Sequence, residues 1–227
     1  VFLDNHDNPR MLSKFGAGRE ADPAVRTAIG KMLATIQLTM RGTPFLFQGQ
    51  ELAAINQHFS GVAELRDVES INRHKALIES GMTEADAWAQ VLAGSRDHSR
   101  VPMRWTTQGG FSEATPWLMG TDDAAGFSAE EQMADPDSVF HWHKQLIMLR
   151  RRHRALTIGS LEWVHPHHKF YFAYKRKLGD EVFLIECNTS AKQRPRPKFS
   201  GKAVPVMGGP RRELMEPWEA TVSRVVG

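Results

Sequence analysis

The chain has 227 residues, with 29 Lys and Arg against 26 Asp and Glu, so its formal net charge is +3. Hydrophobic residues make up 41% and charged residues 24% of the sequence, which is typical of folded proteins and excludes a disordered tail or a low-complexity scaffold. The uncharged stretches 32–40 and 42–50 are too short to span a bilayer, and no secretory signal is present. The single cysteine, Cys187, excludes an intramolecular disulfide and fits a reducing compartment. These features predict a soluble, cytoplasmic protein.

The first fifty residues have the pattern of a strand, a helix and a second strand. The apolar runs 1–3 and 45–47 each break into a polar cluster. Between them, Asp22 as N-cap, Pro23 in the first turn and Gly42 past the end predict a helix. This pattern predicts a βαβ unit of a parallel sheet, with both polar clusters at the carboxyl edge of the strands, where α/β folds carry their chemistry.

Two parallel strands do not make a sheet, and no other strong βαβ repeat follows. The sequence also opens directly on the first strand. We therefore expect the C-terminal piece of a longer α/β protein.

The middle of the chain is predicted to be helical and then irregular. Helices are expected over 62–79 and 84–97, with Thr83 as the second N-cap. The stretch 99–134 is rich in Gly, Thr and Pro, and its Trp105, Phe111 and Trp117 favour an ordered loop that either lines a ligand pocket or packs on the body.

A final helix is predicted from Asp135-Pro136 to about residue 153. The basic run Arg150–Arg154 closes this helix, where cations interact favourably with the helix dipole. No basic face or aromatic stacking pattern accompanies the run, so no nucleic-acid partner is expected.

After residue 156 the hydrophobic period changes from 3.6 to 2, which predicts a small antiparallel β domain. Strands are expected over 161–164, 170–175 and 182–187, with a hairpin turn at Gly179-Asp180, and weaker strands near 203–206, 211–215 and 220–226.

The cluster at residues 4–10 places two carboxylates, an imidazole and a guanidinium at the end of the first predicted strand. Such a cluster suits charge stabilisation in a reaction. A solvated turn capped by Asp and Asn is an equal reading of the local sequence.

Four motifs in order resemble the α-amylase family (glycoside hydrolase family 13), in its oligo-1,6-glucosidase and α-glucosidase branch. They are Asn5-His6-Asp7-x-Pro9-Arg10, Gly42-Thr43-Pro44-Phe45-x-x-Gln48-Gly49-x-Glu51, Ser95-Arg96-Asp97-His98-Ser99-Arg100-x-Pro102-Met103-x-Trp105 and Asp135-Pro136-Asp137-Ser138-Val139-Phe140. The similarity covers nearly all of residues 1–190. It implies an α/β fold in which residues 1–155 form the last two β/α units of a (β/α)8 TIM barrel and residues 156–227 form an antiparallel C-terminal β domain.

The resemblance implies a retaining, exo-acting hydrolysis of terminal non-reducing α-glucosidic bonds, α-1,6 or α-1,4, in short oligosaccharides. Retaining glycosidases use a carboxylate nucleophile and a carboxylic acid about 5 Å apart. In this family those groups follow the fourth and fifth barrel strands, whereas this chain is expected to start at the seventh. The chain alone is therefore expected to be inactive and to need the missing N-terminal barrel part, in cis or in trans.

The resemblance also assigns roles to individual residues. Asp7 corresponds to the family's third acid, which binds sugar hydroxyls and stabilises the oxocarbenium-like transition state. His6 corresponds to the histidine that hydrogen-bonds the bound sugar, and Arg100 to the loop arginine that holds the terminal glucose. Arg10 and Glu51 are expected to support these residues from behind. No cofactor and no metal is expected, since the family's metal site lies in the missing part.

The sequence departs from the family pattern in four places. Asp4 stands where the family usually has Asn, and Gln50 replaces the first Glu of Gln-Gly-Glu-Glu. Arg104 and Thr106 flank Trp105 where Gln and Asp are usual, and the loop 107–133 is shorter. An alternative function is a non-catalytic sugar-binding or structural subunit that needs a partner to complete the barrel.

Other candidate residues favour structural roles. His165, His167 and His168 could ligate a metal, but they fall in a predicted hairpin loop without an acidic or Cys ligand. Cys187 alternates with apolar neighbours and is expected to be a buried hydrophobic residue.

Overall fold

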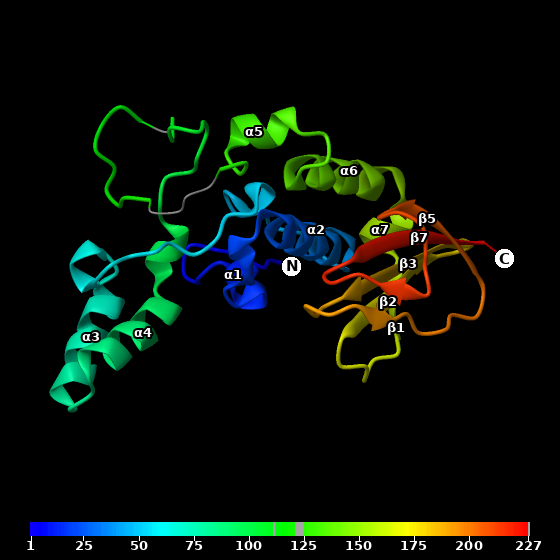
Figure 1. Cartoon of the computed structure of the whole chain (residues 1–227). Coiled ribbons are helices and arrows are strands. Elements are labelled where there is room, and N and C mark those ends of the chain that lie inside the picture. Colours follow the sequence, from blue (N-terminus) through cyan, green and yellow to red (C-terminus); the bar gives the residue numbers. More distant parts are fainter. Residues whose placement is uncertain (111, 121–124, 227) are drawn as a thin grey trace.

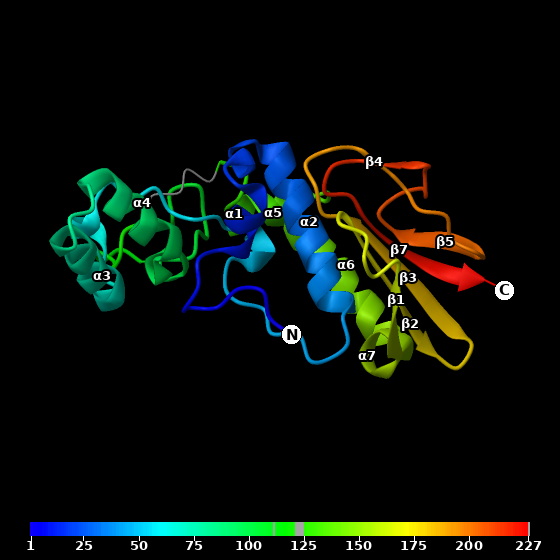
Figure 2. The ribbon, with the colours of Figure 1, turned by 90° about the horizontal axis from the view of Figure 1, so that it is seen from below.

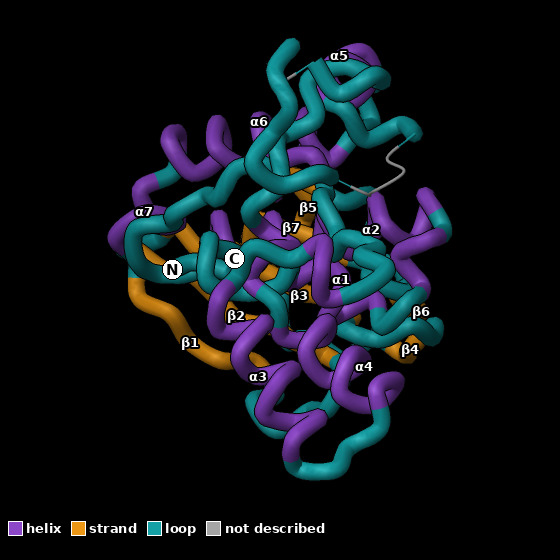
Figure 3. The backbone as a smooth tube through the Cα atoms, turned by 90° about the vertical axis from the view of Figure 1, so that its left-hand side faces the viewer, coloured by secondary structure: helices purple, strands orange, loops and turns teal. Residues whose placement is uncertain are grey.

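The computed structural model describes residues 1–110, 112–120 and 125–226. A helical part comes first, and an antiparallel β part follows (Figure 1). The helix pair α3 and α4 lies at the end of the molecule farthest from the sheet, while α2 and α6 lie next to the sheet (Figures 1 and 2). In Figure 3, viewed from the end that carries α3 and α4, the strands lie behind the helices.

The helices and strands follow in chain order. The helices are α1 Met11–Gly16, α2 Pro23–Thr39, α3 Val68–Glu79, α4 Glu84–Gly94, α5 Ala129–Ala134, α6 Val139–Arg152 and α7 Arg154–Ile158. The strands are β1 Ser160–Val164, β2 Tyr171–Leu178, β3 Glu181–Asn188, β4 Arg194–Pro195, β5 Lys202–Met207, β6 Leu214–Met215 and β7 Ala220–Val226. Among the described residues, no helix is long and apolar enough to cross a membrane.

Helix α2 begins as the sequence predicts. The Asp22 carboxylate accepts hydrogen bonds from the amides of Ala24 and Val25, and Pro23 occupies the first helical turn. Its apolar face, which includes the buried Ile29 and Met32, belongs to the main hydrophobic core. That core also contains residues of α6 and of strands β2, β3 and β7, so the helical part and the sheet bury their apolar faces against each other.

The segments 1–3 and 45–47 lie side by side but are not assigned as strands, so the prediction of regular strands there is wrong in detail. The Val1 amino group donates to the Thr43 carbonyl at 2.7 Å, and the Phe45 amide donates to the Val1 carbonyl at 2.9 Å. This is the hydrogen-bond pattern of a parallel pair. Neither segment belongs to the two sheets formed by the described residues, and Phe2 and Phe45 are 58% and 66% exposed. A parallel pair without neighbouring strands has too few ladder bonds to count as a sheet.

Three predicted helix ends differ from the structure. Helix α3 starts at Val68 instead of Val62, where only a 3-10 turn forms, and α4 ends at Gly94 because the chain enters a second 3-10 turn at residues 96–99. Helix α6 is capped by Ser138, whose hydroxyl accepts from the His141 amide, and not by the Asp135-Pro136 pair. Only at α6 does a side-chain cap fix the helix end; Asp67 at the start of α3 makes no such bond.

The β part confirms the predicted antiparallel strands. The sheet order is β1-β2-β3-β7-β5, and the hairpin of β2 and β3 closes with Leu178 opposite Glu181 around the Gly179-Asp180 turn. Strands β4 and β6 form a second, two-stranded sheet. Tyr174 of β2 is fully buried, and its hydroxyl lies 2.6 Å from the Thr39 hydroxyl at the end of α2.

Arg176 of β2 joins the sheet to the helices. Its side chain is fully buried, and its guanidinium donates to four carbonyl oxygens at 2.5–3.3 Å, those of Thr39, Leu156, Gly159 and Ser160. Arg150 of α6 likewise donates to carbonyls at the end of α2, including those of Leu38 and Met40. Both guanidinium groups therefore neutralise the negative end of the α2 dipole.

A buried ionic network lies inside the β part. Glu186 of β3 is fully buried and forms ion pairs with Arg196 and Arg211, each at 2.9 Å. The Tyr171 hydroxyl donates to the same carboxylate at 2.6 Å. The carboxylate is thus fully paired in a region that excludes water.

Candidate functional site

The structure brings the polar cluster at residues 4–10 against the loop at residues 95–100. The Asn5 side chain folds the first segment into a tight turn by accepting hydrogen bonds from the Asp7 amide and the Asn8 side chain. The Ser99 hydroxyl donates to the Asn8 carbonyl at 2.6 Å, and the Arg100 Nε donates to the His6 carbonyl at 2.8 Å. Two segments more than ninety residues apart thus form one surface.

Three residues predicted from the sequence, His6, Asp7 and Arg100, meet on this surface. The Arg100 Nη2 donates to the Asp7 Oδ1 at 3.0 Å, and the His6 Nε2 lies 3.2 Å from the Asp7 Oδ2. The side chains of His6 and Asp7 are 69% and 50% exposed. A carboxylate, an imidazole and a guanidinium held together and open to solvent can exchange hydrogen bonds with the neighbouring hydroxyl groups of a polar ligand.

Arg10 and Glu51 lie near each other, since the Arg10 charge acts on the Glu51 carboxyl. Arg10 is 3% exposed, and its Nη1 donates to the Gln48 carbonyl at 2.8 Å and lies 3.7 Å from the Asp4 Oδ2. Burial raises the pKa of both Asp4 and Glu51, against the lowering effect of the nearby Arg10 charge. Asp4 also accepts the amide hydrogen of Met11, so its carboxylate stabilises the start of α1.

Two charged residues at the site were missed by the sequence analysis as site residues. Asp67 is 2% exposed and receives the Arg96 side chain through the guanidinium Nε and Nη2. The remaining Nη1 of Arg96 lies 3.9 Å from the Asp7 Oδ1. Burial raises the pKa of Asp67, but hydrogen bonds from Arg96 and Ser70 outweigh it and lower this pKa from 3.8 to about 2. Arg96 stands in the third motif of the sequence, whereas Asp67 falls inside the helix predicted over 62–79, so the sequence offered a signal for Arg96 alone.

His98 anchors the loop from inside. Its Nδ1 accepts the Gln57 amide hydrogen at 2.9 Å, and its Nε2 donates to the Leu92 carbonyl at 2.6 Å. Burial lowers the pKa of His98, so the ring is neutral at pH 7, which agrees with one accepting and one donating nitrogen. His98 therefore fixes the backbone just before Arg100.

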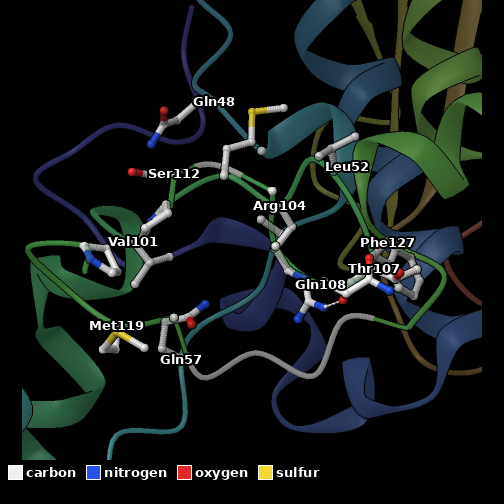
Figure 4. A pocket seen from close by; sticks show the side chains of 18 of the residues that line it. Gln48, Leu52, Gln57, Val101, Arg104, Thr107, Gln108, Ser112, Met119 and Phe127 are labelled. Atoms are coloured by element: carbon white, nitrogen blue, oxygen red, sulfur yellow. Dashed lines mark hydrogen bonds between the residues drawn. The ribbon is translucent and has the colours of Figure 1, made fainter. Parts of the chain in front are cut away.

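A cavity of about 330 Å³ lies beside the site, with Arg10 and Gln48 in its wall (Figure 4). Its other lining residues include Leu52, Gln57, Val101, Arg104, Met119 and Phe127. His6, Asp7 and Arg100 do not line it. The Arg104 Nη2 donates to the Thr107 carbonyl at 2.7 Å within its wall. Trp105 and Trp117 are 49% and 63% exposed, and Phe111 lies outside the described residues.

Two of the three histidines considered as metal ligands, His165 and His168, have other contacts. The His168 Nδ1 accepts the Tyr171 amide hydrogen, and the His165 Nε2 lies 3.3 Å from the Lys198 carbonyl oxygen. Within the part of the chain that the structure describes, no group of three or more His, Cys, Asp or Glu could hold a metal ion. Cys187 is a fully buried free thiol, as expected.

Comparison with known proteins shows the family to which the chain belongs. A sequence profile described as the alpha amylase catalytic domain matches residues 1–159. The chain belongs to the α-amylase family, and it consists of part of the catalytic domain followed by an antiparallel β-sheet domain.

Curated relatives narrow the branch within this family. The chain is 37% identical over 208 residues to the probable oligo-1,6-glucosidase 2 of Bacillus subtilis, an alignment that covers 89% of the chain and 36% of the relative. It is 41% identical over 166 residues to the alpha-glucosidase of Pediococcus pentosaceus, covering 71% of the chain and 29% of the relative. The chain thus spans about a third of the length of these curated relatives.

Solved structures of related enzymes superpose on the whole length of this chain. Trehalulose synthase MutB from Pseudomonas mesoacidophila MX-45 is 32% identical and superposes with a TM-score of 0.90, covering 100% of this chain and 43% of that one. Isomaltulose synthase PalI from Klebsiella sp. LX3 is 32% identical with a TM-score of 0.88, covering 100% and 42%. A MutB mutant has been solved in complex with the substrate sucrose.

Proposed function

We propose that this chain supplies part of the sugar-binding site of a retaining, exo-acting α-glucosidase that hydrolyses terminal α-1,6 or α-1,4 bonds of short oligosaccharides. The observation that carries the proposal is the exposed Asp7 carboxylate, held by Arg100 beside His6, in a chain that resembles oligo-1,6-glucosidases over most of its length. In this proposal residues 1–155 belong to the catalytic barrel and residues 156–227 form the C-terminal β domain.

The contacts support a role for each side chain. The Asp7 carboxylate can accept hydrogen bonds from two sugar hydroxyls, and it stabilises the positive charge that develops on the sugar ring in the transition state. The exposed ring of His6 can bind a hydroxyl beside it. Arg100, anchored through its Nε to the His6 carbonyl, can hold the terminal glucose with its guanidinium. Arg10 and Glu51 support the strand ends from behind.

The proposal places the nucleophile and the general acid in the N-terminal barrel part, joined in cis or in trans. Asp4 and Asp67 are poor candidates for either role, because both are buried and paired with arginines. The chain alone therefore binds sugar without cleaving it. The exposed Phe2 and Phe45 support this view, since an edge strand of a barrel needs a neighbour to cover it.

The test is an assay of isomaltose and 4-nitrophenyl α-glucoside hydrolysis. The purified chain is assayed alone and together with a polypeptide that covers the remaining N-terminal part of the Bacillus subtilis relative. We expect no turnover by the chain alone and turnover by the mixture. Asp7→Asn should lower this turnover about 100-fold or more, as loss of a charge-stabilising group does.

Asp180→Asn in the exposed hairpin turn is the matched control, and it should leave the turnover unchanged. Hydrolysis by the chain alone, or turnover of the mixture that is insensitive to Asp7→Asn, would refute the proposal. A mixture that binds isomaltose and never cleaves it would favour a non-catalytic sugar-binding subunit.

A further inference from the structure

Asp67 occupies the N-cap position of α3 without capping the helix. An N-cap Asp normally accepts a hydrogen bond from an amide two or three residues ahead, but the Asp67 side chain makes no such bond. Its Oδ1 receives the Arg96 guanidinium and its Oδ2 receives the Ser70 hydroxyl at 2.7 Å. The carboxylate thus binds the side chains of Arg96 and Ser70 in place of a backbone amide of the helix.

The position of this carboxylate is fixed by a second buried acid. The Asp97 Oδ2 accepts the amide hydrogens of Arg66 and Asp67 at 2.6 and 2.8 Å, and Asp97 is fully buried. The backbone of Asp67 therefore cannot shift without breaking these two bonds. Asp97 follows Arg96 directly in the sequence, so one dipeptide both places Asp67 and pairs with it.

Asp67, Arg96, Asp7 and Arg100 form a closed ring of alternating charges. Arg96 pairs with Asp67 and lies 3.9 Å from Asp7, while Arg100 lies 3.0 Å from Asp7 and 4.0 Å from Asp67. Of the two arginines, only Arg100 is within direct hydrogen-bond distance of Asp7. A second guanidinium therefore stands about one ångström too far away to bind the same carboxylate.

We propose that Asp67 is a positioning residue that holds Arg96 away from Asp7, so that Asp7 keeps its capacity to accept a sugar hydroxyl. This inference rests on the proposed function of Asp7. Without the Asp67 charge, the carboxylates left near Arg96 are the exposed Glu69, 3.2 Å away, and Asp7, 3.9 Å away, and its guanidinium would move onto Asp7. A carboxylate bound by two arginines has fewer free lone pairs for a ligand.

The test compares four forms of the 227-residue chain by calorimetric titration with isomaltose: wild type, Asp67→Asn, Arg96→Gln and the double variant Asp67→Asn/Arg96→Gln. Asp67→Asn should weaken binding about tenfold, which is 1.4 kcal/mol. Arg96→Gln should weaken binding less than Asp67→Asn does, because it removes the guanidinium that would otherwise move onto Asp7. The double variant should bind within about threefold of Arg96→Gln, because the freed arginine is gone.

Recovery in the double variant distinguishes positioning from a structural role. If Asp67 only stabilises the loop, the double variant will bind as weakly as Asp67→Asn or more weakly, and the inference is overturned. The same holds if Asp67→Asn binds like wild type.

A crystal structure of Asp67→Asn gives a readout that does not depend on sugar. Arg96 should lie within direct hydrogen-bond distance of Asp7, and an Arg96 that stays on residue 67 would overturn the inference. If wild type fails to bind isomaltose, the proposed function loses its support, while the position of Arg96 in the variant still decides the role of Asp67.

Discussion

Arg176 gives the sharpest test of how the two parts of the chain are joined. Replacing it with Met keeps an unbranched side chain in the core and removes its guanidinium hydrogen bonds to four carbonyl oxygens, of which that of Leu156 keeps a second donor in Arg150. Hydrogen bonds to a charged group contribute about 1.5–3 kcal/mol each, or about 6–12 kcal/mol for four if they were additive. Burying the guanidinium costs several kcal/mol, which the variant regains. We therefore expect the free energy of unfolding to fall by about 3–5 kcal/mol.

The assay is urea unfolding at 25 °C followed by far-UV circular dichroism, with the free energy taken from linear extrapolation. Lys177→Met is the matched control, because Lys177 is the next residue of β2 and its side chain is exposed. It should change the free energy of unfolding by less than about 0.5 kcal/mol. A loss below about 1 kcal/mol for Arg176→Met would refute the reasoning, since removing these hydrogen bonds would then cost almost nothing.

Three further predictions follow from buried polar groups. The pKa of Asp67 falls from 3.8 to about 2 on folding, so its charge contributes about 2 kcal/mol of stability above pH 4, and this is lost as the pH falls toward 2. In urea unfolding across this range, the free energy of unfolding of Asp67→Asn should therefore depend less on pH than that of wild type. Arg196→Met removes one partner of the buried Glu186 and should cost about 3–5 kcal/mol in the same assay; an unchanged midpoint would show that Arg211 alone suffices. Burial raises the pKa of the Cys187 thiol, so Ellman's reagent should react with it only after unfolding, and rapid labelling of native protein would contradict this.

The elements that the sequence predicts well carry their signals locally. Asp22-Pro23 specifies the start of α2, and Gly179-Asp180 specifies the β2–β3 turn, because each acts on atoms within a few residues. The start of α3 was misplaced for the opposite reason. The Asp67 carboxylate is used by Arg96, 29 residues away, and local propensity carries no information about such a partner.

The candidate site also has residues that the sequence predicts and residues that it does not. The resemblance to a family singled out His6, Asp7 and Arg100, and the structure places them together; their roles stay predictions. The ring that adds Asp67 and Arg96 depends on where the loop at residues 95–100 packs. The segments 1–3 and 45–47 have the composition of strands, but strand formation depends on neighbours that local sequence does not specify.

The shared core of α2 and the sheet has a consequence for any attempt to divide the chain. Tyr174 and Arg176 hold the end of α2, and with the proposed division at residue 155 both belong to the β domain. A protein shortened to residues 1–155 would therefore leave in water the carbonyl of Thr39 and the part of the α2 apolar face that packs on the sheet. Such a truncation should aggregate instead of folding as a smaller unit. A chimera that takes its β part from one relative would therefore also need that relative's α2 surface, and we expect the helical part and the β part to change together in evolution.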